Sequence, residues 1–222
     1  MLSQAYRMSV YPLMTRYAMH SPEMLARLFQ RSIHYLGVLV FPIVAGIILL
    51  SDKTISLIFG SGFQASTVVL RILVLILPSI FLNVPNSRMM LVHDRQNLSL
   101  LFLLLGFILN VLLNLALDPI WGASGAAIAR LSSTFLYFGL NSLFVVRHLN
   151  QANALRSLIK PVFATLVMSV IVWLARDWSL LLSICVGITT YSIALLLIGG
   201  ILPAETAMIR RILNKRQSWF KV

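Results

Sequence analysis

The sequence predicts an all-α polytopic membrane protein with about six transmembrane helices. Hydrophobic residues make up 59% of its 222 residues and charged residues only 11%, and the mean hydropathy is +0.91. A soluble domain of this size needs a charged shell, which this composition cannot supply. Apolar runs that approach or exceed the roughly 20 residues needed to cross a bilayer recur along the chain. They are too long for the strands of a membrane barrel, which leaves helices.

The predicted spans follow one another with short connections. They cover residues 32–51, 66–85, 98–118, 122–146, 158–175 and 179–201. Pro42 and Pro78 lie near the centres of the first two spans, where a missing backbone donor favours a kink or a broken helix. The predicted organisation is an N-terminal segment, four spans, two further spans and a basic tail, over residues 1–31, 32–146, 158–201 and 202–222.

The N-terminal segment, residues 1–31, is too charged to cross the bilayer, so we expect a partial helix on the cytoplasmic side. It does not begin with a basic region followed by a short apolar core, and no cleavable signal is predicted.

Basic residues alternate between the connections. They precede the first span, lie between the second and third, surround the start of the fifth and follow the sixth, whereas the other connections hold only Lys53 and Arg176. This asymmetry follows the positive-inside rule and predicts that both termini are cytoplasmic. The net charge of +12 is thereby explained by topology. Nucleic-acid binding is not predicted, because no basic stripe with interleaved aromatic residues is present.

The residue types that carry catalysis or bind metals are sparse. Cys185 is the single cysteine, and the four histidines have neither ligand spacing nor nearby carboxylates. His34, near the cytoplasmic end of the first span, is expected to be an interfacial residue. The sequence holds no phosphate-binding loop, nucleophile elbow or carboxylate pair, so it predicts no enzyme, no metal and no cofactor.

Four polar residues inside the spans are the candidate site: Arg71, Arg130, Asn110 and Asn114. The two arginines are about 8 Å and about 12 Å below the outer face, at 1.5 Å per residue. Asn110 has much the same depth as Arg130, and Asn114 lies one turn nearer the surface on the same face. A charge inside the membrane is costly, which makes it a candidate functional residue.

The stretch ILNVLLNLALDPIWGASGAAIARLSS, residues 108–133, predicts a tight helical hairpin. Pro119 is expected to end the third helix, and the small residues after it let two backbones approach closely. Gly122, Ala126 and Arg130 are spaced by four, so we expect Arg130 to share the face of the small residues. It would then point towards protein or a cavity and away from lipid.

Each candidate has a structural alternative. Arg71 could extend to the outer headgroups, and Arg130 could pair with Asp118 at the outer end of the hairpin. Asn110 and Asn114 could form interhelical hydrogen bonds instead of contacting a ligand.

The same stretch resembles polysaccharide flippases of the multidrug/oligosaccharidyl-lipid/polysaccharide exporter superfamily, such as those for O-antigen or exopolysaccharide. The paired asparagines, the proline near the helix end and the GASGAAIA block are similar to that family's pattern. FPIVAGIILLSDKTISLIFGSGFQAS, followed by VLRILVLILP, resembles two preceding helices and their interfacial turn, and YPLMTRY resembles the end of a helix before those. The resemblance covers residues 5–148.

The resemblance implies the C-terminal part of a two-lobed transporter in the bacterial cytoplasmic membrane. Such proteins move an undecaprenyl-pyrophosphate-linked oligosaccharide to the outer leaflet by alternating access around a cationic cavity. The implied partners are this lipid-linked oligosaccharide, the bilayer, the missing N-terminal lobe and the polysaccharide polymerase machinery. The implied cavity residues are Arg130, Arg71, Asn110 and Asn114.

Two other functions stay open at this stage. One is a cation-coupled multidrug exporter of the same superfamily, which would usually need an intramembrane carboxylate, whereas Asp118 lies at a helix end. The other is a membrane scaffold or remnant that transports nothing, because the resemblance covers only part of a transporter.

Overall fold

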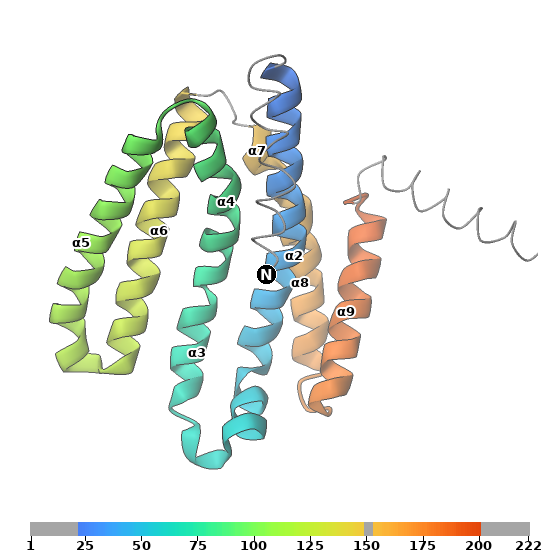
Figure 1. The fold of residues 1–222 in the computed structure, drawn as a ribbon. Helices are drawn as coiled ribbons and strands as arrows, with labels where there is room; N and C mark the ends of the chain where they lie inside the picture. The colour runs from blue at the N-terminus through green and yellow to red at the C-terminus, as the bar shows by residue number, and fades with distance from the viewer. Residues whose placement is uncertain (1–21, 149–152, 201–222) are drawn as a thin grey trace, which may run out of the picture.

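The computed structural model describes residues 22–148 and 153–200, and this part of the chain is a bundle of up-and-down helices (Figure 1). The elements are α2 (Pro22–Phe59), the short 3-10 turn η1 (Ser61–Phe63), α3 (Ser66–Val74), α4 (Ile76–Val92), α5 (Gln96–Trp121), α6 (Ala123–His148), α7 (Asn153–Arg156), α8 (Ile159–Leu174) and α9 (Leu180–Leu197). Helices α5 and α6 lie at one edge, α8 and α9 at the other, and α2, α3 and α4 lie between them.

The predicted all-α fold is confirmed, and the first three predicted spans fall within α2, the α3–α4 pair and α5. The other three overlap α6, α8 and α9 but extend beyond the ends of these helices, and residue 201 lies outside the described residues. Four segments are long and apolar enough to cross a membrane: Pro22–Phe59, Ser66–Val92, Gln96–Trp121 and Leu180–Leu197. Helix α8 is apolar but has only 16 residues, and α6 has 26 residues with polar side chains along its length. The described chain is a multi-pass membrane protein.

The first two helical segments extend beyond the apolar runs. Helix α2 has 38 residues and begins before the predicted start at residue 32, and the second segment continues to Val92 instead of residue 85. The extra turns of α2 and α4 contain polar residues, which is why the hydropathy of the sequence does not assign them to a span. One face of these turns is nevertheless buried. Phe29 of α2, Met90 of α4 and Val145 of α6 belong to the same apolar cluster. This burial stabilises helical turns that lie outside the predicted apolar spans.

The two central prolines behave differently. Pro42 lies inside the uninterrupted helix α2. Pro78 follows a break at Leu75, where α3 ends and α4 begins. A proline at residue 78 has no N–H to donate to the carbonyl of Val74, which accounts for the interruption.

The hairpin between α5 and α6 is tighter than predicted, and Pro119 does not end α5. Pro119 lies within the last turn, and the helix continues to Trp121. Proline has a backbone φ suited to a helix and removes one hydrogen bond, so a single turn can continue past it. The helix ends at Gly122, whose φ of 53° is in the left-handed region and whose N–H bonds the Asp118 carbonyl at 2.8 Å.

The close contact between these helices is made by a different face from the one predicted. Gly125, Ala129 and Ser133, spaced by four, are buried, as is Ala127, whereas Arg130 is exposed. A Cβ atom placed on Gly125 would lie 2.4 Å from the Leu117 carbonyl oxygen, so only glycine fits there. Arg130 follows Ala129 by one residue, which turns it about 100° around the helix, away from this contact.

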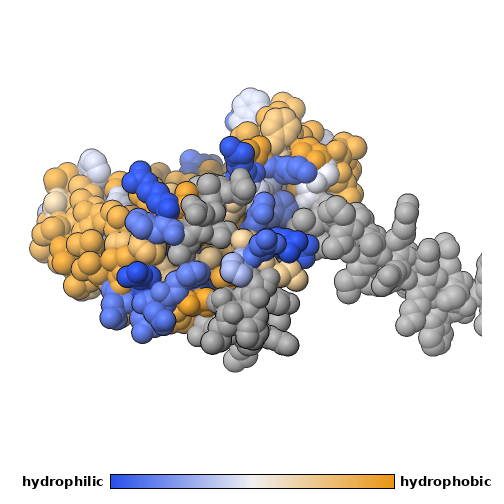
Figure 2. All heavy atoms as spheres, turned by 90° about the horizontal axis from the view of Figure 1, so that it is seen from above, coloured by the Kyte–Doolittle hydropathy of each residue, from blue (hydrophilic) through white to orange (hydrophobic). Residues whose placement is uncertain are grey.

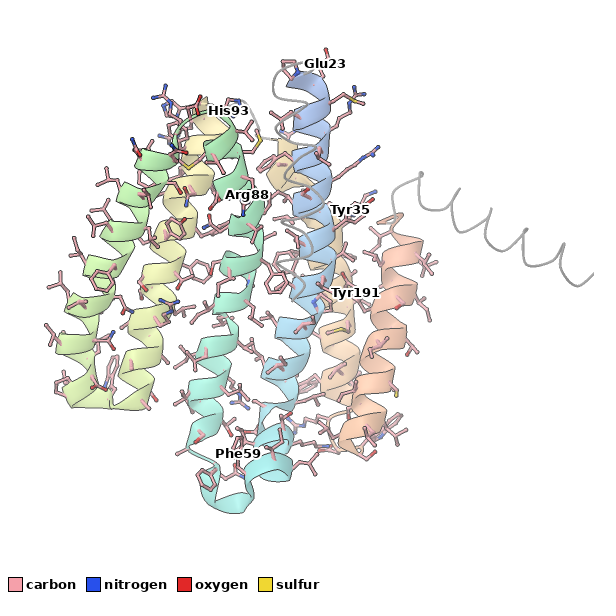
Figure 3. The ribbon with its side chains drawn as sticks, in the orientation of Figure 1. Glu23, Tyr35, Phe59, Arg88, His93 and Tyr191 are labelled. Atoms are coloured by element: carbon pink, nitrogen blue, oxygen red, sulfur yellow. The ribbon has the colours of Figure 1, made fainter. Side chains whose placement is uncertain are left out.

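Charged residues gather at one end of the bundle. Glu23 and His93 lie at this end, and Phe59 lies at the opposite end (Figure 3). Seen from the Glu23 end, hydrophilic residues cover the middle and hydrophobic residues form the flanks (Figure 2). Since the helices alternate in direction, the basic residues at this end are Arg27, Arg31, Arg88, Arg95, Arg147, Arg156 and Lys160. Lys53 and Arg176 lie at the other end.

Candidate functional site

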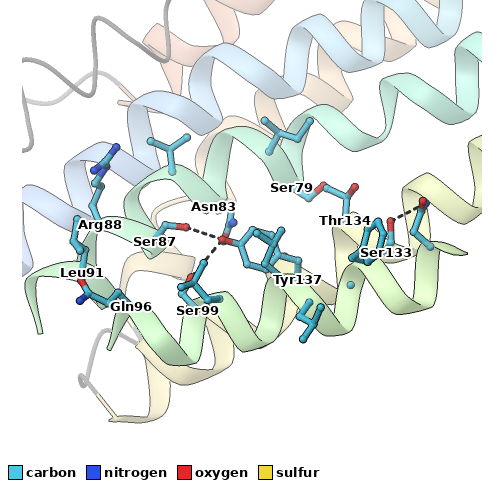
Figure 4. A pocket seen from close by; sticks show the side chains of 18 of the residues that line it. Ser79, Asn83, Ser87, Arg88, Leu91, Gln96, Ser99, Ser133, Thr134 and Tyr137 are labelled. Atoms are coloured by element: carbon cyan, nitrogen blue, oxygen red, sulfur yellow. Dashed lines mark hydrogen bonds between the residues drawn. The ribbon is translucent and has the colours of Figure 1, made fainter. Parts of the chain in front are cut away.

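A groove of about 1300 Å³ lies between α4 and α5, and α6 packs against both of these helices behind it (Figure 4). Its walls mix leucine and phenylalanine side chains with serine, asparagine, glutamine and tyrosine. Arg88 and Arg130 are the only charged residues among the described residues that line it. The groove is therefore amphipathic, and the charged side chains that line it in the described chain are cationic. An ionic contact is stronger in a low-dielectric environment than in water.

Arg130 lines this groove from α6. Its backbone carbonyl accepts hydrogen bonds from the hydroxyls of Ser133 at 2.9 Å and Thr134 at 2.8 Å. Within the described ranges 22–148 and 153–200, its guanidinium has no hydrogen bond or ion pair. The alternative of an ion pair with Asp118 is absent from this part of the chain. The five N–H donors of Arg130 are thus available to a ligand.

The two candidate asparagines form a short chain of hydrogen bonds. Asn110 lines the groove and donates from Nδ2 to the Ser133 hydroxyl of α6 at 3.3 Å. Asn114 does not line the groove. It donates from Nδ2 to the backbone carbonyl of Asn110 at 2.8 Å and to its Oδ1 at 3.2 Å. Asn110 therefore lies beside Arg130 in the groove, and Asn114 orients it.

Arg71 lies elsewhere. Its Nε donates to the Ser51 hydroxyl at 2.7 Å, and its Nη2 bonds the Asp52 carboxylate at 2.6 Å. Both partners belong to α2, and Arg71 is not among the residues that line the groove. The structure thus brings together Arg130 and Asn110 but not Arg71.

A second polar cluster surrounds the hydroxyl of Tyr137 in the same groove. The hydroxyl lies 3.5 Å from Ser87 Oγ of α4 and 3.3 Å from Ser99 Oγ of α5 (Figure 4). Asn83 and Asn141 flank the same hydroxyl. The Ser99 hydroxyl also donates to Asn141 Oδ1 at 3.2 Å.

Two buried polar atoms of this cluster have no hydrogen-bond partner in the part of the chain that the structure describes. They are Asn83 Oδ1, an acceptor, and Asn141 Nδ2, a donor. A buried polar atom without a partner is costly. Of the two residues, Asn83 lines the groove, and its Oδ1 could accept a hydrogen bond from a hydroxyl group.

The sequence analysis missed this cluster and Arg88. Arg88 was assigned to the connection after the second span, but α4 continues through it. The signal that could have revealed the cluster is the spacing of four between Ser133, Tyr137 and Asn141, which places three polar side chains on one face of α6.

No family model matches the chain. A protein of Haloferax volcanii, described as the probable low-salt glycan biosynthesis flippase Agl15, is 27% identical over 154 residues, which are 68% of this chain and 31% of that protein. The solved structure of the lipid II flippase MurJ, in its inward closed conformation, superposes with a TM-score of 0.68 at 16% identity. This superposition covers 86% of the chain and 43% of the MurJ chain.

The chain has a flippase-type fold. It spans about a third of the length of the curated relative and less than half of the MurJ chain. Both similar proteins are named as flippases. In the present chain, helices α4, α5 and α6 of this fold form the groove.

Proposed function

We propose that this chain is the C-terminal part of a flippase that moves an undecaprenyl-pyrophosphate-linked oligosaccharide across the cytoplasmic membrane for surface polysaccharide synthesis. The observation that carries the proposal is a groove on a flippase-type fold whose described lining contains two arginines and no carboxylate. Its weak similarity to a glycan biosynthesis flippase supports the same class of cargo.

The groove contains side chains that could bind the pyrophosphate and the sugar of such a substrate. A guanidinium binds phosphate through two parallel charge-assisted hydrogen bonds, so Arg130 would hold the pyrophosphate, with Arg88 further along the same groove. The unpartnered Oδ1 of Asn83, which lines the groove, suits a sugar hydroxyl. No bond is made or broken: the protein binds the polar headgroup while the lipid tail stays in the bilayer.

An open groove cannot by itself shield a charged headgroup from lipid. We propose that an N-terminal lobe covers the groove and that alternating access of the two lobes moves the substrate. The polysaccharide polymerase machinery would take the product at the outer face. In this arrangement the Glu23 end of the bundle and both termini are cytoplasmic, as the positive-inside rule predicts.

The cation-coupled multidrug exporter is the weaker candidate. Ion coupling usually relies on a carboxylate within the membrane, and the groove-lining residues that the structure describes include none. Asp118, which lies in the last turn of α5, is not among them.

Replacement of Arg130 tests the proposal in cells whose surface polysaccharide depends on the protein that carries this chain. We expect Arg130→Ala to abolish export and to cause lipid-linked oligosaccharide to accumulate, because losing a charge-assisted pair weakens binding by roughly tenfold to a hundredfold. Arg130→Lys keeps the charge without the planar fork and should retain part of the export. Export is measured as surface polymer per cell, normalised to protein in the membrane.

Two matched controls separate substrate binding from structure. Asp118→Asn and Arg71→Ala change ionisable residues of neighbouring helices outside the groove, so both should export polymer better than Arg130→Ala. Normal export by Arg130→Ala at normal membrane levels would exclude the substrate-binding role and favour the remnant or scaffold.

A further inference from the structure

His34 of α2 is buried, not interfacial as the sequence suggested; only 7% of it is exposed. Its ring reaches two segments that are distant in sequence. Nδ1 lies 2.9 Å from the carbonyl oxygen of Ser157, just before α8, and Nε2 lies 2.6 Å from that of Gly200, just after α9. One imidazole therefore connects α2 to the start of α8 and to the end of α9.

The chemistry of the two partners determines the protonation state that fits. A backbone carbonyl oxygen only accepts hydrogen bonds, so a ring nitrogen must carry a proton to bond it. Neutral imidazole has one N–H, and its other nitrogen would direct a lone pair at a carbonyl oxygen. Only the doubly protonated imidazolium satisfies both contacts of His34.

The local backbone holds the Gly200 carbonyl in place. Gly199, with φ of 63°, ends α9 in the left-handed region. The Gly200 N–H then bonds the Leu195 carbonyl at 2.8 Å and the Gly199 N–H bonds that of Leu196 at 3.1 Å, which is the Schellman pattern. The carbonyls at a helix C-terminus attract cations. Lys160 of α8 also donates to the Gly199 carbonyl, at 2.8 Å.

In residues 22–148 and 153–200, His34 has no ion pair with a carboxylate. The ionisable side chains around the ring on α2 are Arg31 and Tyr35, whose ring meets that of His34 edge to face at 5.9 Å. Those on the helices packed against α2 are Arg88, Arg156, Lys160 and Tyr191. The Ser157 and Gly200 carbonyls are therefore the described groups that the two ring nitrogens face.

We propose that protonated His34 is a latch that fastens the α8–α9 pair to α2, and that loss of the Nε2 proton, which bonds the Gly200 carbonyl, releases the end of α9. Deeper along α9, the Tyr191 hydroxyl donates to the Val38 carbonyl of α2 at 2.7 Å (Figure 3). This second contact needs no imidazole proton, so it stays and acts as the pivot. Release then moves the α9 end and leaves the rest of the helix in place.

The latch lies at one end of a second, largely apolar hollow of about 1170 Å³ between α2, α8 and α9. The hollow is lined by Arg31, one turn before His34, and by Tyr35, which directly follows it. Leu195, near the end of α9, also lines it. Opening the latch would therefore widen the hollow at its basic end. Imidazole is the side chain that changes protonation near neutral pH, so the width would follow the local proton concentration.

Distance measurements between spin labels test the latch in the full chain. Labels on Gln30→Cys and Leu197→Cys, in a Cys185→Ser background, report on α2 and the end of α9; both labelled positions are exposed. We expect the distance to lengthen by about 2 Å or more as pH rises from about 5 to about 8. A label pair on Gln30→Cys and Leu143→Cys should show no change, because α6 is not held by His34.

Variants assign the effect to one residue. His34→Gln cannot donate from both sides, so it should show the long distance at every pH. His93→Gln is the matched control, because His93 bonds only the Met89 carbonyl of its own turn, and it should keep the pH response. An unchanged wild-type distance across this pH range, or an unchanged response in His34→Gln, would overturn the proposal.

Protonation can be measured without altering His34. In protein with ¹⁵N-labelled histidine and His20, His93 and His148 replaced by glutamine, the remaining imidazole signals belong to His34. Both nitrogens should be protonated at low pH, and one proton should be lost over the range in which the label distance changes. A neutral ring at low pH with the short distance retained would refute the latch even if His34→Gln did not fold.

Discussion

Two arginines inside the membrane-spanning helices have different surroundings, and this separates their roles. Arg71 is bonded to Ser51 and Asp52 of the neighbouring helix. Arg130 has no side-chain partner among the described residues and lines a groove without carboxylates. An intramembrane cation that is already neutralised stabilises the fold, whereas one without a partner is available to an anionic ligand. The arginines look alike in sequence, so only their neighbours distinguish them.

A double-mutant cycle should show that Arg71 has a structural role. We expect Arg71→Ala and Asp52→Asn each to lower stability and the double variant to lose less than their sum. The coupling should be at most about 1 kcal/mol, because the side chains are 42% and 57% exposed. Thermal unfolding in detergent measures it. Zero coupling would mean that this ion pair does not hold α3 to α2.

At the scale of elements, the α5–α6 hairpin determines the shape of the candidate site. Gly125 lies against the Leu117 carbonyl, and a Cβ on Gly106 of α5 would lie 3.1 Å from the Ser133 carbonyl of α6. Close approach of the backbones at both points brings Asn110 within hydrogen-bonding distance of Ser133. The small residues thus position the polar side chains that face the groove.

Gly125→Ala should therefore destabilise the protein, by about 1–3 kcal/mol for an overpacked contact. Gly139→Ala is the matched control on the same helix, because a Cβ there meets nothing within 4 Å. Alanine is the better helix former, so this control should be neutral or stabilising by up to about 1 kcal/mol. The comparison is made by thermal unfolding of both variants. Equal stability of the two would exclude the close approach.

At the scale of the molecule, the alternating helices collect most basic residues of the described chain at the Glu23 end. This segregation is the physical basis of the predicted orientation, since the translocation of basic connections is disfavoured. The same orientation places the His34 latch near the cytoplasmic side and the α5–α6 turn near the outer side.

Reporter fusions test that orientation. A fusion after residue 222 should be active only as a cytoplasmic reporter, and one in the turn near Ser61 only as a periplasmic reporter. Residues 201–222 lie outside the described part of the chain, so this measurement also locates the predicted basic tail. Periplasmic activity of the C-terminal fusion would contradict the predicted number of spans.

The sequence by itself determined the helical class, the presence of several apolar helices and the distribution of charge, because these depend on local composition and on the length of apolar runs. It also singled out Arg130 and Asn110, since polar residues are conspicuous in an apolar run.

Only the tertiary structure decided which helical faces meet, because each residue turns a helix by about 100° and a small error in phase moves a side chain to another surface. It paired Arg71 with Asp52, placed Arg88 in the groove and gathered polar groups around Tyr137. It also brought Ser157 and Gly200 to His34. These contacts join residues distant in sequence, and their geometry follows from how whole helices pack.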